Sequence, residues 1–146
     1  MYTIDNVVGA LVEIRIWSPV SVDEAVEWAL DHERVVNSTR GEYVCFVDLV
    51  HASVFPQKVA DAYTAVMRDE LRLRRTGVLL GESAVQSLQV DRMLRETGNP
   101  VRRAFREVPD LLGWLDPTLG PVERGRLRLV LKDRGHIERG GPRPQS

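Results

Sequence analysis

One stretch, YVCFVDL at residues 43–49, is almost continuously apolar and rich in residues that favour strands. A strand with apolar side chains on both faces is typical of the interior of a parallel sheet that helices cover on both sides. The sequence therefore predicts a central, parallel strand over residues 43–49.

Residues 8–17, upstream of this strand, alternate between apolar and polar side chains, with Glu13 and Arg15 among the polar ones. A period of two predicts a half-buried strand whose polar face meets solvent. The turn-forming residues Asp5, Asn6 and Gly9 separate it from residues 1–4, so the two segments are expected to pair as a β-hairpin.

The first helix is predicted from a capping box. Ser21 and Glu24 have the spacing at which each side chain satisfies a free backbone amide of the other residue, so a helix should begin at Val22 and end near residues 37–41. Apolar residues at helical spacing should form its buried stripe, namely Val22, Ala25, Val26, Ala29 and Val36.

Strands and helices continue to alternate along the rest of the chain. Pro56 suits the start of a helix whose apolar spacing reaches Leu71, and a short buried strand is expected at residues 76–81. The other expected elements are a helix over residues 82–97, a weak edge strand over 101–108 and two helices begun by prolines.

This order predicts an α/β fold with a mixed, mostly parallel sheet of about five strands and four to five helices. A single domain is expected over residues 1–133. Residues 134–146 offer nothing to bury and are expected to form a flexible C-terminal tail.

Composition narrows the class of protein. The 146 residues are 43% hydrophobic and 28% charged, which excludes disordered and collagen-like chains. The single cysteine, Cys45, can form neither an internal disulfide nor a cysteine-based zinc site, and it falls inside the predicted central strand, so we expect a buried thiol and a cytoplasmic protein.

Net charge is −1 and no apolar run approaches the roughly 18 residues of a membrane span, so neither a nucleic-acid partner nor integral membrane association is expected.

Two strand-to-helix loops are the candidate site, because ligands of open α/β sheets bind beyond the carboxyl ends of the parallel strands. The candidate residues are Asp48, His51, Ser53 and Gln57 in the first loop and Gly81, Glu82 and Ser83 in the second.

Catalysis at these loops has weak support in the sequence. A relay from Asp48 through His51 to Ser53 can be drawn, but adjacent residues rarely supply the geometry of a triad. The second loop has Val85 where a nucleophile elbow needs glycine, so Ser83 or Glu82 is expected to cap the following helix. No dinucleotide, phosphate-loop or zinc motif is present in the sequence, and we predict no cofactor and no metal.

The element order and an apolar strand that ends in Asp48-Leu49 before a loop and helix resemble the STAS domain of anti-sigma-factor antagonists, including its divergent bacterial and CRAL-TRIO-like branch. The resemblance covers approximately residues 1–133. It implies a non-enzymatic regulatory module that binds a protein partner, often under control of a phosphorylated serine. Here Pro56-Gln57-Lys58 occupy the place of the phosphoacceptor motif, so classical phosphoswitching is not expected.

The sequence is therefore compatible with two functions. The first is a protein-interaction module that docks through the two loops. The alternative is a small-ligand or lipid-binding domain, which needs an apolar cavity of at least about 300 Å³ between sheet and helices.

Overall fold

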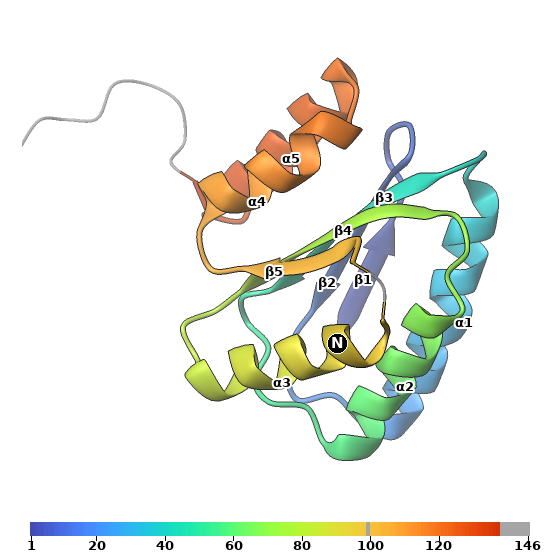
Figure 1. The fold of residues 1–146 in the computed structure, drawn as a ribbon, viewed down its shortest axis with the longest axis vertical. Helices are drawn as coiled ribbons and strands as arrows, with labels where there is room; N and C mark the ends of the chain where they lie inside the picture. The colour runs from blue at the N-terminus through green and yellow to red at the C-terminus, as the bar shows by residue number, and fades with distance from the viewer. Residues whose placement is uncertain (99, 138–146) are drawn as a thin grey trace, which may run out of the picture.

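The structure is a computed structural model that describes residues 1–98 and 100–137. Over these residues the chain forms one five-stranded sheet, in the order β1-β2-β3-β4-β5, and five α-helices (Figure 1). The predicted mixed, mostly parallel α/β sheet is confirmed. The strands are β1 (Tyr2–Asp5), β2 (Leu11–Ile16), β3 (Tyr43–Leu49), β4 (Leu73–Leu80) and β5 (Arg102–Phe105), and the helices are α1 (Val22–Ser38), α2 (Gln57–Arg68), α3 (Ala84–Glu96), α4 (Val108–Leu115) and α5 (Pro121–Asp133).

The strand order explains how the helices are distributed. β1 pairs antiparallel with β2 as the predicted hairpin, and β2 to β5 run parallel in sequence order. Right-handed crossovers that all progress in one direction place their helices on the same face of a sheet. Accordingly α1, α2 and α3 cover one face, and α4 and α5 cover the other (Figure 1).

β3 is the central strand, as predicted, with β2 on one side and β4 on the other. Cys45 lies in the core beneath α1 to α3, whereas Val44 and Phe46 face α4 and α5. Burial raises the pKa of the Cys45 thiol well above its ordinary value, and the nearby Glu70 carboxylate raises it further. Cys45 is therefore a buried core residue, as expected, whose environment disfavours the thiolate.

β2 is more deeply buried than its alternation predicts. Glu13 is only 2% exposed, because α5 covers the face that was expected to meet solvent. Its carboxylate accepts two hydrogen bonds from Arg126 of α5, from Nε at 2.8 Å and from Nη2 at 3.0 Å. The half-buried assignment of this strand was wrong because its charge partner lies far along the chain.

α1 begins at Val22 as predicted, and the Ser21 hydroxyl accepts a hydrogen bond from the Glu24 amide. The predicted buried stripe is wrong at Val22 and Val26, which are exposed. Ala25 is buried as predicted, and Ala29 and Val36 are half-buried against the core. The other buried residues of α1 are Trp28, His32 and Val35, and the Trp28 ring stacks on His32 and meets Tyr63 of α2 edge-on. In the same layer, α2 ends at Arg68, which leaves Leu71 exposed rather than on a helix face.

The C-terminal boundary also differs from the prediction. Beyond the last residue of α5, Arg134 and His136 turn back onto the sheet and contact the Asp48 carboxylate. Residues 134–137 are thus packed rather than part of a flexible tail, and the remainder of the predicted tail, residues 138–146, lies outside the described residues.

Candidate functional site

The two predicted loops lie side by side at the carboxyl edge of the sheet. β3 and β4 pair in parallel with Leu49 opposite Leu80, so the chain leaves both strands at the same level. A Cβ atom at Gly81 would lie 2.7 Å from the Val50 carbonyl oxygen. Glycine is therefore required at residue 81, because the two loop backbones touch there.

A buried glutamine of α3 ties the loops together. The Gln86 side-chain amide donates to the carbonyl of Leu49 at 3.1 Å and to that of Ala52, and its oxygen accepts from the Gly81 amide at 3.3 Å. One helical turn on, Gln89 accepts from the Phe55 amide and donates to the Phe55 carbonyl, both at 2.8 Å. These bonds hold both loops in one shape.

The loop hydroxyl and amide groups have structural roles. Ser83 caps α3, as predicted, by accepting a hydrogen bond from the Gln86 amide at 3.2 Å. The Ser53 amide donates to the Ser18 hydroxyl at 2.7 Å, and the Gln57 side chain donates to Asp61 at 2.8 Å.

The predicted candidates divide into an exposed set and a buried carboxylate. His51, Ser53, Gln57, Glu82 and Ser83 are exposed, and Gly81 is half-buried. Asp48 is 1% exposed and faces α5, so its carboxylate cannot reach a partner.

The environment of Asp48 contradicts the relay drawn from the sequence. One carboxylate oxygen accepts from the Val50 amide at 3.1 Å, and the other lies 2.8 Å from His136 Nε2 and 3.1 Å from Arg134 Nη1. His51 instead lies on the outer side, with its ring centroid 6.4 Å from that of His136. Asp48, Arg134 and His136, with Arg15 at 3.9 Å, form a buried ion cluster.

This cluster shifts the protonation of Asp48. Burial on its own raises the pKa of a carboxyl, but hydrogen bonds from His136, Val50 and Arg134 outweigh it and lower the pKa of Asp48 below its ordinary value. The folded protein therefore holds Asp48 ionised more strongly than the unfolded chain does.

Asp48 is expected to give the stability an acid dependence. The pKa of Asp48 is lower in the folded protein than its value of about 3.9 in an unfolded chain. Its contribution to the free energy of unfolding is therefore complete at pH values well above 3.9, and it is lost as the pH falls through the folded pKa. The free energy of unfolding in urea should fall from pH 5 to pH 3, and Asp48→Asn should make that fall shallower. The control is Asp91→Asn at an exposed position of α3, and a parallel fall in Asp48→Asn would contradict the prediction.

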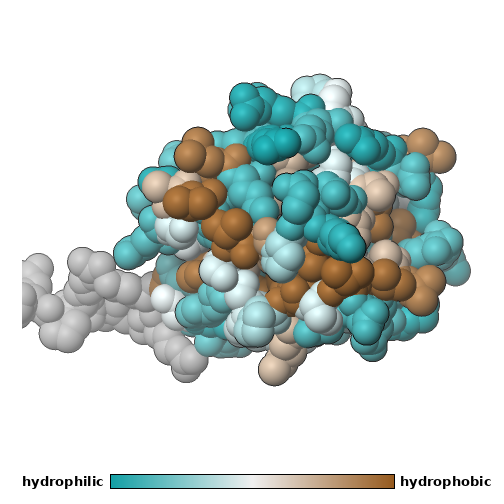
Figure 2. Space-filling model, turned by 90° about the horizontal axis from the view of Figure 1, so that it is seen from below, coloured by the Kyte–Doolittle hydropathy of each residue, from teal (hydrophilic) through white to brown (hydrophobic). Residues whose placement is uncertain are grey.

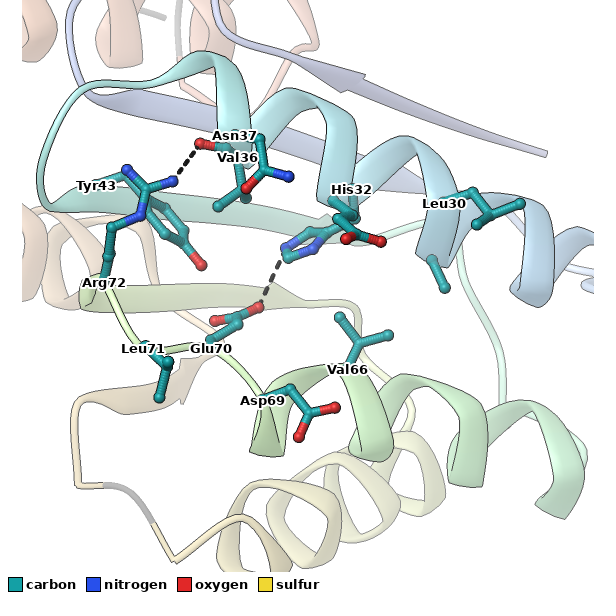
Figure 3. Close-up of a pocket in the computed structure, with 12 residues that line it drawn as sticks. Leu30, His32, Val36, Asn37, Tyr43, Val66, Asp69, Glu70, Leu71 and Arg72 are labelled. Carbon is teal, nitrogen blue, oxygen red and sulfur yellow. Dashed lines mark hydrogen bonds and ion pairs between the residues drawn. The ribbon is translucent and has the colours of Figure 1, made fainter.

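A second polar cluster, not found by sequence reasoning, lies at the opposite edge of the sheet. Glu70, between α2 and β4, has one carboxylate oxygen 3.1 Å from His32 Nε2 and the other 3.1 Å from Arg102 Nη2. All three side chains are less than one-tenth exposed. The His32 ring of α1 faces the Glu70 carboxylate, which comes from the segment that follows α2 (Figure 3).

The space between sheet and helices is small. An apolar cavity of about 70 Å³ lies beneath α1 and α2, lined by side chains such as Trp28, Phe55 and Met93. Carriage of a lipid or another small molecule there needs at least about 300 Å³. The volume does not favour the ligand-carrying alternative in the sheet interior.

Residues 1–98 and 100–137 contain neither a group of metal ligands nor a membrane-spanning helix. In this part of the chain no three His, Cys, Asp or Glu side chains are grouped to hold a metal ion. None of its helices combines the length and the apolar character that a membrane crossing requires.

The chain matches no protein-family model, no curated protein and no solved structure.

Proposed function

We propose that this protein is a non-enzymatic regulatory module of the STAS-like type that docks a protein partner on the carboxyl-edge loops and the neighbouring face of α3. The observation that supports it most is the combination of a fixed loop backbone with exposed apolar side chains. Val54 in the first loop and Val85 and Leu88 on α3 are 42%, 63% and 69% exposed.

Fixed geometry is what makes such a surface suited to docking. Gln86 and Gln89 hold the loops before any partner arrives, so binding costs little ordering entropy. Figure 2, which views the side where α2 and α3 lie, shows apolar surface in patches divided by polar residues. Single exposed apolar residues are ordinary, but several beside one preformed groove are typical of interaction sites.

The groove itself lies between α2 and α3. It has a volume of about 260 Å³, with Val85, Leu88 and Met93 on its apolar side and Gln57, Asp61 and Glu96 among its polar residues. An apolar side chain of the partner would enter beside Leu88, while its basic groups would face Asp61 in the groove and Glu82 in the neighbouring loop. Glu96 is already paired with the lining Arg92, whose Nε lies 3.2 Å from its carboxylate. The STAS-like resemblance implies the class of partner, which is a kinase, an anti-sigma factor or a transporter partner.

A pair of matched substitutions tests this proposal. Leu88→Asp should lower the affinity for the partner roughly tenfold to hundredfold, the loss typical of a disturbed interface centre. The control is Leu129→Asp on α5, an exposed leucine on the opposite face of the sheet, which should leave affinity unchanged. Both substitutions replace exposed side chains. The melting temperature of each variant should therefore stay near that of the unsubstituted protein.

Proteins retained by each variant from native lysate are compared quantitatively, and the affinity of any candidate is then measured with purified components. A partner lost with Leu88→Asp and kept with Leu129→Asp supports the proposal. Equal retention by both variants contradicts it, and so does a substrate turned over by the protein and lost in Ser53→Ala.

A further inference from the structure

The buried ion cluster around Asp48 holds more positive than negative charge. Arg15 Nε, Arg134 Nη1 and His136 Nε2 all face the same carboxylate oxygen of Asp48, at 3.9, 3.1 and 2.8 Å. No other carboxylate of the described residues lies within 4.0 Å of either guanidinium. Two guanidinium groups therefore share one carboxylate, and the cluster has one positive charge in excess even when His136 is neutral.

The two ion pairs that α5 makes within the described chain are matched one to one. Glu13 accepts two hydrogen bonds from Arg126, and Asp116 accepts two from Arg128. Charges that are largely withdrawn from water are normally paired in this way. The excess charge at Asp48 therefore calls for a second anion.

Arg15 is the member of the cluster whose donors are open. Its side chain is 23% exposed and makes no hydrogen bond with any residue that the structure describes. The separation of 3.9 Å from Asp48 is too long for a hydrogen bond. Of the three nitrogens in this side chain only Nε is cut off from solvent, so the two Nη atoms can meet a ligand.

Trp17 holds this guanidinium in place. The Arg15 Cζ atom lies 4.4 Å from the centroid of the half-buried Trp17 ring. A guanidinium over a ring face keeps its N–H donors, which lie in the guanidinium plane, for an acceptor such as a carboxylate. The donors are thus positioned before a ligand arrives, and binding costs little side-chain entropy.

The open donors lie at the edge of the sheet where ligands of α/β proteins bind. Arg15 of β2 is opposite Asp48 of β3, and each is the last residue but one of its strand. The carboxyl ends of parallel strands are the usual ligand-binding edge. The groove between α2 and α3 lies on the other face of the sheet and shares no residue with the cluster, so the two sites are independent.

We infer that Arg15 and Arg134 bind a carboxylate of another molecule at this edge. The Nη atoms of Arg15 donate to its two oxygens, and the Arg134 guanidinium, which uses Nη1 on Asp48, stands beside them. A carboxylate suits the site better than a phosphate dianion, because it cancels the single excess charge and is repelled less by Asp48. Such a group belongs either to a small organic acid or to an acidic side chain of another protein, and the chemistry of recognition is the same for both.

Two probes of nearly equal shape test the charge requirement. Acetate and acetamide are titrated against the full chain near neutral pH and at constant ionic strength. Binding is followed by NMR through the Nε–H signal of Arg15, which burial protects from exchange with water. Acetate should bind at least about tenfold more tightly than acetamide. The Nε–H signal of Arg126, which is already bound to Glu13, should not shift. Equal binding of the two probes, or equal shifts of the two arginine signals, would overturn the inference.

Two arginine variants test the contact. Arg15→Gln should weaken acetate binding at least about tenfold. Its melting temperature should stay near that of the unsubstituted protein, because the closer partners of Asp48 remain. Arg92→Gln is the matched control, since Arg92 is an exposed arginine of α3 that is paired with Glu96. Unchanged acetate affinity in Arg15→Gln, or equal losses in both variants, would refute the assignment.

The source of the carboxylate is distinguished by two further comparisons. Tighter binding of Nα-acetyl-glutamate α-amide than of acetate assigns the site to an acidic side chain of another protein, and weaker binding assigns it to a small acid. Glu138→Gln removes an acidic group of the chain itself, outside the described residues. A clear gain in acetate affinity in this variant would show that the chain occupies the site itself and would overturn the inference. Leu88→Asp should leave acetate affinity unchanged, so failure of the docking proposal and failure of this one give different results.

Discussion

A chain that ends at Asp133 is expected to unfold roughly 10 to 20 °C below a chain that ends at Ile137. The shorter chain lacks Arg134 and His136, which contact the buried Asp48 carboxylate at 3.1 and 2.8 Å. Asp48 then keeps the Val50 amide and the more distant Arg15, at 3.9 Å. Removing one side of a buried ion pair costs about 3 to 5 kcal/mol, because the other charge stays in a poorly solvated place.

The comparison between the two lengths isolates residues 134–137. Thermal unfolding followed by circular dichroism measures the difference, and Asp48→Asn in the shorter chain serves as the rescue. A neutral amide needs no counterion, so that variant should recover part of the loss. Equal melting temperatures for the two lengths would show that the contacts of Arg134 and His136 do not stabilise the fold.

Gln86→Leu is expected to lower the free energy of unfolding by about 3 to 5 kcal/mol. Leucine has a similar volume but leaves the carbonyls of Leu49 and Ala52 and the amide of Gly81 without their side-chain partner. Gln86 is fully buried, so water cannot take its place at these groups. The loss should be accompanied by faster hydrogen exchange at Gly81.

Gln89→Leu is the matched control on the same helix. It removes two bonds to the Phe55 backbone from a half-buried position that water can reach, and should cost only about 1 to 2 kcal/mol. Urea unfolding with equal m-values compares the variants. A loss below about 1 kcal/mol for Gln86→Leu would contradict the role of this residue in joining the loops.

Local sequence patterns were sufficient to predict those elements whose structure depends on residues close together in the chain. The apolar run at residues 43–49 identified the central strand, and the spacing of Ser21 and Glu24 located the start of α1. Ser83 likewise caps α3 as its position predicted. In each case the contacts that matter join residues a few positions apart.

Predictions failed where the partner lies far along the chain. The alternation in β2 predicted that Glu13 faces solvent, but Arg126 of α5, which is 113 residues away in the chain, covers it and donates to its carboxylate. Asp48 pairs with His136, 88 residues away, rather than with His51. Periodicity along one segment carries no information on which distant helix will cover it.

In the candidate site too, the features set by local sequence were predicted and those set by distant contacts were not. The sequence located both loops at one edge of the sheet, because parallel strands end together. It did not reveal Gln86 as their link, since a glutamine in a helix has no distinctive local signal. The excess positive charge at Asp48 was also missed, because Arg134 lies 86 residues away in the chain.

The placement of α4 and α5 on their own face of the sheet has a consequence for synthesis. After β5 is complete, Leu11, Val44 and Phe46 remain uncovered until residues 106–131 have been added. At 5 to 20 residues per second this takes about 1 to 5 s. During that interval the nascent chain presents an apolar sheet face that contains the carboxylates of Glu13 and Asp48, still without Arg126, Arg134 and His136. We expect these charges to hinder association with other chains until α5 covers the face.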